Sequence, residues 1–201
     1  MGIPTLSRAQ GHKGTGAQGH KGTRAQGHKE VRLESKNIVI RDWREDDLAS
    51  LVKHANNFNI WINLRDAFPY PYTEDAGIGW LQMALAEKHN LLLAIEIDGE
   101  AVGGIGAHFL SDVYRINCEI GYWLSESCWG QGIVSTAVTL LIDHIFANYP
   151  DITRIYADLF AYNPASARVL EKCGFHLEAV HKNAVMKNGK VVDEHRYVRF
   201  R

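Results

Sequence analysis

The feature that most constrains the fold is a glycine-rich turn at residues 129–136, which reads Trp-Gly-Gln-Gly-Ile-Val-Ser-Thr. It follows a strand-like run at 116–124 and opens a helix-like run at 133–147. The first N–H groups of a helix have no internal partner, and the helix dipole adds partial positive charge there. Glycine lets an anion approach the backbone closely. The turn therefore predicts a protein that binds a phosphate-bearing ligand.

Two common phosphate-binding patterns do not fit this turn. A nucleotide P-loop needs Gly-Lys-Ser/Thr, and the turn contains no lysine. A dinucleotide pattern needs a third glycine, but Ser135 stands in its place. The turn has to be interpreted together with its neighbours.

Flanking motifs narrow the prediction. Upstream, residues 119–124 read Glu-Ile-Gly-Tyr-Trp-Leu; downstream, residues 163–166 read Asn-Pro-Ala-Ser and residues 169–175 read Val-Leu-Glu-Lys-Cys-Gly-Phe. This ordered set resembles the GNAT superfamily of acyl-CoA-dependent N-acyltransferases, and within it the Rim-type, ribosomal-protein acetyltransferase-like branch. The resemblance covers residues 36–201. The family's phosphate loop, Q/R-x-x-G-x-G/A, would run over residues 129–134, where the first and last positions depart from the pattern; the Trp-Gly-x-Gly form resembles the Rim-type variant.

The resemblance implies a co-substrate and a place for it. Acetyl-CoA would lay its pyrophosphate on the turn, and its pantetheine arm would pair with exposed backbone where two central strands splay apart near Leu124. The residues expected to bind it are Tyr122, Trp123, Leu124, Trp129, Gly130, Gln131, Gly132, Ile133, Val134, Ser135, Thr136 and Asn163.

Glu119 is the candidate general base. Side chains alternate along a strand, which places Glu119, Gly121 and Trp123 on one face and Ile120, Tyr122 and Leu124 on the other. A carboxylate on a buried central strand is desolvated, which raises its proton affinity and suits it to take a proton from an amine. The alternative is a structural Glu119 paired with an arginine or lysine.

Ser166 is the candidate acid for the departing thiolate. This role is implied by the resemblance. Many family members protonate the thiolate with a tyrosine in the helix that follows, but Leu170 occupies that position and cannot donate a proton. Rim-type members also tend to lack the tyrosine, and for them the serine is the candidate acid. Asn163 and Pro164 are also a good helix cap and first helical residue, so the motif has a purely structural interpretation.

An aromatic, irregular segment occupies residues 61–73, and loops of this kind on a rigid scaffold often build binding sites. The resemblance implies that this segment lines the acceptor pocket. Arg65 would contact a carboxylate or carbonyl of the acceptor, and Asp66 would suit a cationic amine. The expected substrate-binding residues are Leu64, Arg65, Asp66 and Tyr70. The alternative is an aromatic patch that closes the edge of the core.

Composition limits the remaining possibilities. The formal net charge of −1 gives no sign of a nucleic-acid partner, and no apolar run is long enough to cross a bilayer. Three cysteines without a C-x-x-C motif favour a reducing, cytoplasmic location, with Cys118 and Cys173 as small core residues. No ligand spacing is recognisable among His108, His176, His181 and His195, which are expected to be ordinary surface or core residues, so no metal is expected. The chain is expected to be a monomer or a homodimer.

Two regions are expected along the chain. Residues 1–30 contain the motif Ala-Gln-Gly-His-Lys three times with a period of eight residues and few apolar side chains, which predicts a disordered low-complexity tail. The alternative to a tail without function is metal binding by its three histidines. Residues 31–201 would form the acetyltransferase domain.

Local signals outline the elements of that domain. They predict strands at 38–41, 91–97, 101–109, 116–124 and 153–160, two more strands around Asn188-Gly189, and helices from residues 45, 73, 133 and 164. Mixed rather than alternating elements indicate an α+β fold. The resemblance implies the GNAT fold, a central mixed, largely antiparallel twisted sheet of about seven strands flanked by about four helices.

The sequence thus predicts an N-acetyltransferase that moves an acetyl group from acetyl-CoA to a primary amine, in a ternary complex and without an acyl-enzyme. The amine would belong to a protein N-terminus or to a small molecule. The alternative is a non-catalytic acyl-CoA-binding sensor, suggested by Leu170 and Val134. A third hypothesis, a nucleotide-binding protein, is weakened by the missing lysine.

Overall fold

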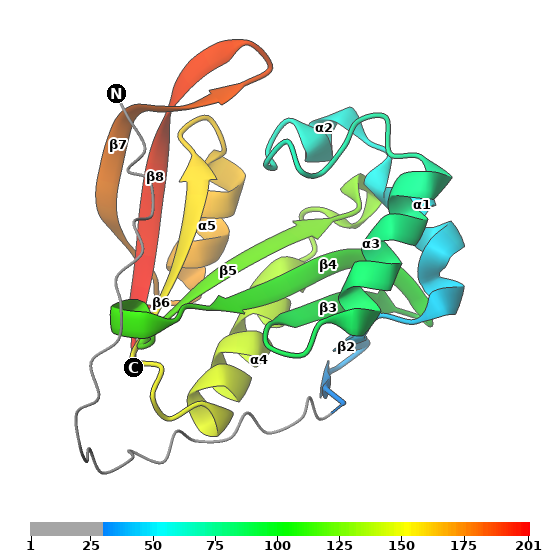
Figure 1. Ribbon diagram of the computed structural model, residues 1–201, viewed down its shortest axis with the longest axis horizontal. Helices are drawn as coiled ribbons and strands as arrows, with labels where there is room; N and C mark the ends of the chain where they lie inside the picture. The colour runs from blue at the N-terminus through cyan, green and yellow to red at the C-terminus, as the bar shows by residue number, and fades with distance from the viewer. Residues whose placement is uncertain (1–29) are drawn as a thin grey trace, which may run out of the picture.

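The computed structural model describes residues 30–201, and the predictions for the repeat lie outside these residues. The described chain forms one eight-stranded sheet with the order β1-β2-β3-β4-β5-β6-β8-β7 (Figure 1). All neighbours are antiparallel except β5 and β6. The strands are β1 (Arg32–Ser35), β2 (Ile38–Asp42), β3 (Leu91–Ile97), β4 (Glu100–Phe109), β5 (Asn117–Leu124), β6 (Arg154–Phe160), β7 (His176–Lys187) and β8 (Lys190–Phe200).

Five α-helices accompany the sheet: α1 (Leu48–Ala55), α2 (Phe58–Trp61), α3 (Glu74–Ala86), α4 (Ile133–Asn148) and α5 (Pro164–Lys172). Three short 3-10 helices, η1 (Glu45–Asp47), η2 (Asp112–Tyr114) and η3 (Glu126–Cys128), complete the fold. Side-chain caps fix two helix starts: Thr73 Oγ1 accepts from the Ala76 amide, and Asn163 Oδ1 accepts from the Ser166 amide. Among residues 30–201, no helix has the length and apolarity needed to cross a membrane.

The core is divided between the two faces of the sheet. Leu93 and Ile95 of β3 pack in the larger cluster with α4, whereas Ala94 between them packs in a second cluster with α1 and α3. This alternation is the expected consequence of a strand buried on both faces. The central strands are therefore held from both sides, and they form a rigid base for the loops at their ends.

Most predicted elements are confirmed, and three differ. The sheet gains β1, a four-residue edge strand whose short alternation was too weak to predict. Pro69 and Pro71 predict an irregular stretch at 58–72, but this stretch begins with α2, one helical turn that Asn57 Oδ1 caps. The acidic start of the first helix is the separate helix η1, where Asp47 is buried and makes two hydrogen bonds to the Arg41 guanidinium, at 2.7 and 2.8 Å.

Candidate active site

The centre of the sheet opens between its two parallel strands. β5 and β6 pair only where residues 117–119 face residues 154–156, and beyond this point β5 keeps a partner on the β4 side alone. We call the resulting gap the wedge; Figure 1 shows the two strands diverging there. β6 stays paired with β8 along its other edge, just as β5 stays paired with β4. Both sides of the wedge are therefore fixed by neighbouring strands. The splay that the resemblance implied is thus present.

A cavity of about 1260 Å³ occupies the wedge and continues toward the α2 loop and the β7–β8 hairpin. Its wall is largely apolar, with charged side chains at the end near α2. All of the predicted site residues line it except Gln131, Thr136 and Tyr70. Tyr70 is instead part of an exposed aromatic cluster, with ring centroids 5.7 Å from Phe58 and 5.6 Å from Trp61.

The predicted phosphate loop, residues 129–136, lies at the end of β5. Gly130 and Gly132 both have positive φ, 76° and 77°, and a Cβ at either position would meet only open space. The first backbone bond of α4 runs from the Thr136 amide to the Gly132 carbonyl at 3.1 Å. The Thr136 amide is therefore occupied within the helix, and the amides of residues 133–135 are those left for an anion.

Side chains tie this loop to the first two helices. Buried Ser125 hydrogen-bonds His54 Nδ1 at 2.8 Å, and His54 Nε2 lies 2.9 Å from a Glu100 carboxylate oxygen. One residue further, the Glu126 carboxylate accepts from the amides of Asn57 and Asn59 at 2.7 and 3.0 Å. The loop that follows β5 is thus fixed to the elements that carry the predicted acceptor segment.

Glu119 stands where β5 and β6 part. Its side chain is 22% exposed rather than fully buried. Its carboxylate is paired with the guanidinium of Arg65, and the Tyr156 hydroxyl lies 3.4 Å away. The structure therefore contains the ion pair that was the alternative interpretation of Glu119, although Arg65 comes from a loop and not from the sheet.

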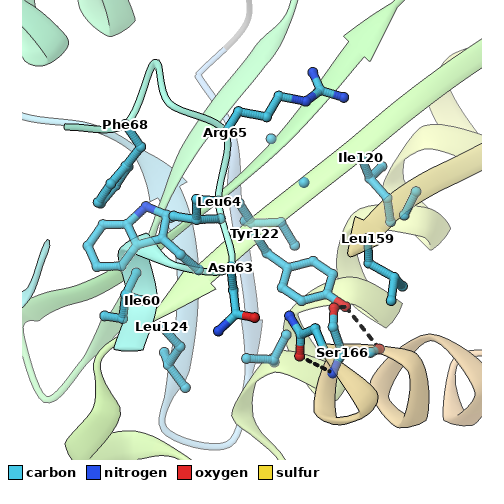
Figure 2. A pocket seen from close by; sticks show the side chains of 18 of the residues that line it. Ile60, Asn63, Leu64, Arg65, Phe68, Ile120, Tyr122, Leu124, Leu159 and Ser166 are labelled. Atoms are coloured by element: carbon cyan, nitrogen blue, oxygen red, sulfur yellow. Dashed lines mark hydrogen bonds between the residues drawn. The ribbon is translucent and has the colours of Figure 1, made fainter. Parts of the chain in front are cut away.

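On the other face of β5, Tyr122 points across the wedge to the start of α5. Its hydroxyl oxygen lies 2.7 Å from Ser166 Oγ and 3.3 Å from the Ser166 carbonyl oxygen (Figure 2). Burial raises the pKa of Tyr122, so its hydroxyl stays protonated at any ordinary pH. Asn163 caps α5 through the Ser166 amide at 3.1 Å, which confirms the structural interpretation of that motif.

The acceptor segment meets the tip of the β7–β8 hairpin over the cavity. Lys187 is buried, with 1% of its side chain exposed, and its ammonium contacts Asp66 at 2.7 Å and lies 3.9 Å from the centre of the Trp61 ring. Tyr162 adds a 2.6 Å hydrogen bond to the Ile62 carbonyl. Asp66, predicted to meet a cationic substrate, thus has a cation of the same chain as its partner.

Several residues of the cavity were not predicted. Asp158, Lys187 and Glu194 line it, and so does His108, which was assigned an ordinary structural role. Tyr156 reaches Glu119 only through the pairing of β6 with β5. These residues come from strands whose order in the sheet is not encoded locally, so the chain offered no signal for them. Cys118 is buried as expected, and burial raises the pKa of its thiol to about 12.

A family model described as an acetyltransferase (GNAT) domain matches residues 37–176. The chain belongs to the GNAT acetyltransferase family. It is an acyl-CoA-dependent N-acetyltransferase, and the names of its relatives support the Rim-type branch of the family.

Two sequence relatives of this acetyltransferase are informative. The uncharacterised N-acetyltransferase YoaA of Bacillus subtilis (strain 168) is 34% identical over 136 residues, which cover 68% of this chain and 70% of YoaA. The ribosomal-protein-serine acetyltransferase of Escherichia coli (strain K12) is 35% identical over 102 residues, 51% of this chain and 56% of that protein. The match to the second relative thus spans little more than half of its length.

A solved structure shares the architecture. RimL, a ribosomal alpha-N-protein acetyltransferase in complex with coenzyme A, superimposes with a TM-score of 0.75 at 25% identity, over 85% of this chain and 98% of RimL. The fold of this chain is therefore shared with a protein that binds coenzyme A.

Proposed function

We propose that this acetyltransferase moves the acetyl group of acetyl-CoA directly to a primary amine bound in the same cavity. The observation that carries the proposal is the wedge. It leaves the β6-facing edge of β5 unpaired beyond Glu119, and it ends at the glycine loop. A slender arm with amide groups fits an unpaired strand edge, and a pyrophosphate fits a helix N-terminus. CoA joins these two chemical features in one molecule.

The acetyl-CoA site is built mainly from the main chain. The amides of residues 133–135 would hold the pyrophosphate, while Gly130 and Gly132 leave room for its approach. The pantetheine arm would lie along β5 toward Leu124, whose backbone would help to polarise the thioester carbonyl. Leu124 is itself held in place, because its carbonyl accepts a 2.8 Å hydrogen bond from the Trp129 indole.

Glu119 would serve as the base. The amine nitrogen forms the new C–N bond with the acetyl carbon, the C–S bond breaks, and its electron pair leaves with sulfur. The proton from nitrogen passes to the Glu119 carboxylate, directly or through one water. Since Arg65 now pairs with that carboxylate, the neutral amino group of the acceptor would replace the guanidinium beside it.

The departing sulfur would meet Ser166 on the opposite side of β5. Glu119 and Ser166 approach the cavity from different faces, so the base and the hydroxyl can act on opposite sides of one reacting carbon. Ser166 is the one hydroxyl in the α5 sequence, and Leu170 on the same helix is buried and apolar.

For the acceptor we propose the α-amino group of a protein or peptide. This rests on the names of the ribosomal-protein acetyltransferase relatives and on the charged end of the cavity, where Arg65 is 69% exposed and free to turn toward a backbone carbonyl once displaced. A small amine remains the second choice, because Lys187 and Asp66 bridge the cavity and narrow its mouth.

Release of free CoA thiol from acetyl-CoA, measured against a panel of N-terminal peptides and small amines, tests the proposal. Peptide turnover above all small amines would support it, and CoA binding without any turnover would refute it. Glu119→Gln should lower kcat by about 10²- to 10⁴-fold with acetyl-CoA binding retained. The control is Glu34→Gln, an exposed carboxylate on β1 outside the cavity, which should leave kcat unchanged. Wild-type activity in Glu119→Gln at every pH would remove Glu119 as the base.

A further inference from the structure

The contact between Tyr122 and Ser166, which we call the hydroxyl pair, has a specific arrangement of atoms. The two hydroxyl oxygens are 2.7 Å apart, and the Tyr122 hydroxyl also lies 3.3 Å from the Ser166 carbonyl oxygen (Figure 2). The pair spans the wedge from β5 to α5. Both residues line the cavity, so the pair faces the space assigned to the thioester.

Each hydroxyl has one hydrogen, and this restricts the pair to two arrangements. In the first, Tyr122 donates to Ser166 Oγ, and the Ser166 hydrogen is left to point into the cavity. In the second, Ser166 donates to Tyr122, and the Tyr122 hydrogen turns to the Ser166 carbonyl. Only the first arrangement offers a donor to a ligand through Ser166.

Chemistry favours the first arrangement once an anion is near. A phenol is a stronger acid than an aliphatic alcohol, and it is the better hydrogen-bond donor of the two. Burial raises the pKa of Tyr122, which keeps the phenol protonated and able to donate. Donation into Ser166 Oγ also polarises the Ser166 hydroxyl, since hydrogen bonds in a chain strengthen one another.

We propose that Tyr122 is a positioning residue, which directs the hydrogen of Ser166 toward the sulfur of departing coenzyme A. The inference rests on the proposed function, and it assigns this role to a side chain of β5. Sulfur leaves with the electron pair of the C–S bond as a thiolate. Ser166 donates a hydrogen bond to it, Tyr122 donates to Ser166, and neither hydroxyl has to lose its proton.

The kinetic test is a double-mutant cycle. Tyr122→Phe should lower kcat about three- to tenfold, the value of one hydrogen bond, with the KM for acetyl-CoA changed less than about twofold. The loss should be equal at low and high pH, because Tyr122 keeps its proton throughout. In a Ser166→Ala background, Tyr122→Phe should have no further effect. Tyr149→Phe, which removes a phenol hydroxyl outside the cavity lining, is the matched control and should leave kcat unchanged.

A second measurement does not depend on turnover. The ultraviolet absorbance of the thiolate reports the pKa of the thiol in protein-bound CoA. An aligned Ser166 donor stabilises the thiolate, so Tyr122→Phe and Ser166→Ala should each raise that pKa by about half to one unit. Tyr149→Phe should not change it.

The outcomes are separable. Equal kcat losses from Tyr122→Phe in the wild-type and Ser166→Ala backgrounds would show that Tyr122 does not act through Ser166, and would overturn the inference. A change in KM alone, or an unchanged thiol pKa in Tyr122→Phe, would do the same. If no amine is acetylated, the proposed function fails, whereas the thiol titration still decides whether Tyr122 directs Ser166.

Discussion

At the scale of single residues, a cluster of buried charges around Arg41 lies away from the cavity. Arg41 is buried, and its guanidinium contacts Asp47 at 2.7 and 2.8 Å and Glu96 at 2.5 Å. These contacts raise the pKa of Arg41, the Asp47 hydrogen bond most of all. Asp47 also accepts from the Arg44 amide at 2.8 Å, so one carboxylate fixes both the β2 cation and the chain turn into α1.

Removal of this carboxylate should be costly. Asp47→Ala leaves a buried guanidinium with one partner lost, and the expected loss is about 3–5 kcal/mol in the free energy of unfolding. Glu34→Ala removes an exposed partner of Arg32 and should cost less than about 1 kcal/mol. Urea unfolding of both variants checks the difference. Equal losses in the free energy of unfolding would show that burial does not determine how strongly the Arg41–Asp47 pair stabilises the fold.

At the scale of elements, the start of α4 combines a conformational requirement with a ligand requirement. Gly132 has a φ of 77°, and a Cβ there would project into open space beside the phosphate loop. Gly189, in the β7–β8 turn, has a similar φ of 73° and equally open surroundings. The two glycines therefore share the strain that alanine would bring, but only one lies where a phosphate would bind.

Gly132→Ala and Gly189→Ala should each cost about 1–2 kcal/mol of stability. Calorimetric titration with CoA should separate them. Gly132→Ala should weaken binding about tenfold or more, because the methyl group stands where the pyrophosphate approaches, while Gly189→Ala should leave the affinity unchanged. A shared loss of affinity would mean that destabilisation, not the position of the glycine, controls CoA binding.

The elements were largely predictable because their signals are local. The strand 91–97 was predicted with the bounds that the structure has, and the Asn163–Pro164 cap starts α5 as expected. The contacts that complete the site are not local. Tyr122 meets Ser166 across 44 residues and Lys187 meets Asp66 across 121, and no sequence period links such positions. The candidate site was therefore predicted as motifs, and its hydrogen-bond partners were not.

At the scale of the whole molecule, the tip of the β7–β8 hairpin reaches the α2 loop, and the two enclose the acceptor end of the cavity (Figure 1). Lys187 makes the connection through Asp66 and the Trp61 ring. A desolvated cation over an aromatic ring is worth about 2 kcal/mol. This single side chain therefore couples the last strands of the chain to its early helices.

Lys187→Met should loosen both ends of this connection. We expect amide hydrogen exchange to rise about tenfold in residues 58–68 and in the β7–β8 turn, with the exchange of β3 and β4 unchanged. Lys182→Met removes an exposed lysine paired with Asp193 and is the matched control. Increased exchange in the hairpin alone would show that the α2 loop is held by other contacts.

The unpaired edge of β5 has a consequence for how far sequences in this family can diverge. Peptide N–H and C=O groups are the same for every residue type, so a binding edge made from them survives replacement of most side chains that flank it. Selection then acts on few positions: those that keep β5 and β6 apart, those that need glycine, and those whose side chains transfer protons. This chain and RimL share their fold at 25% identity, a divergence that such an edge would tolerate.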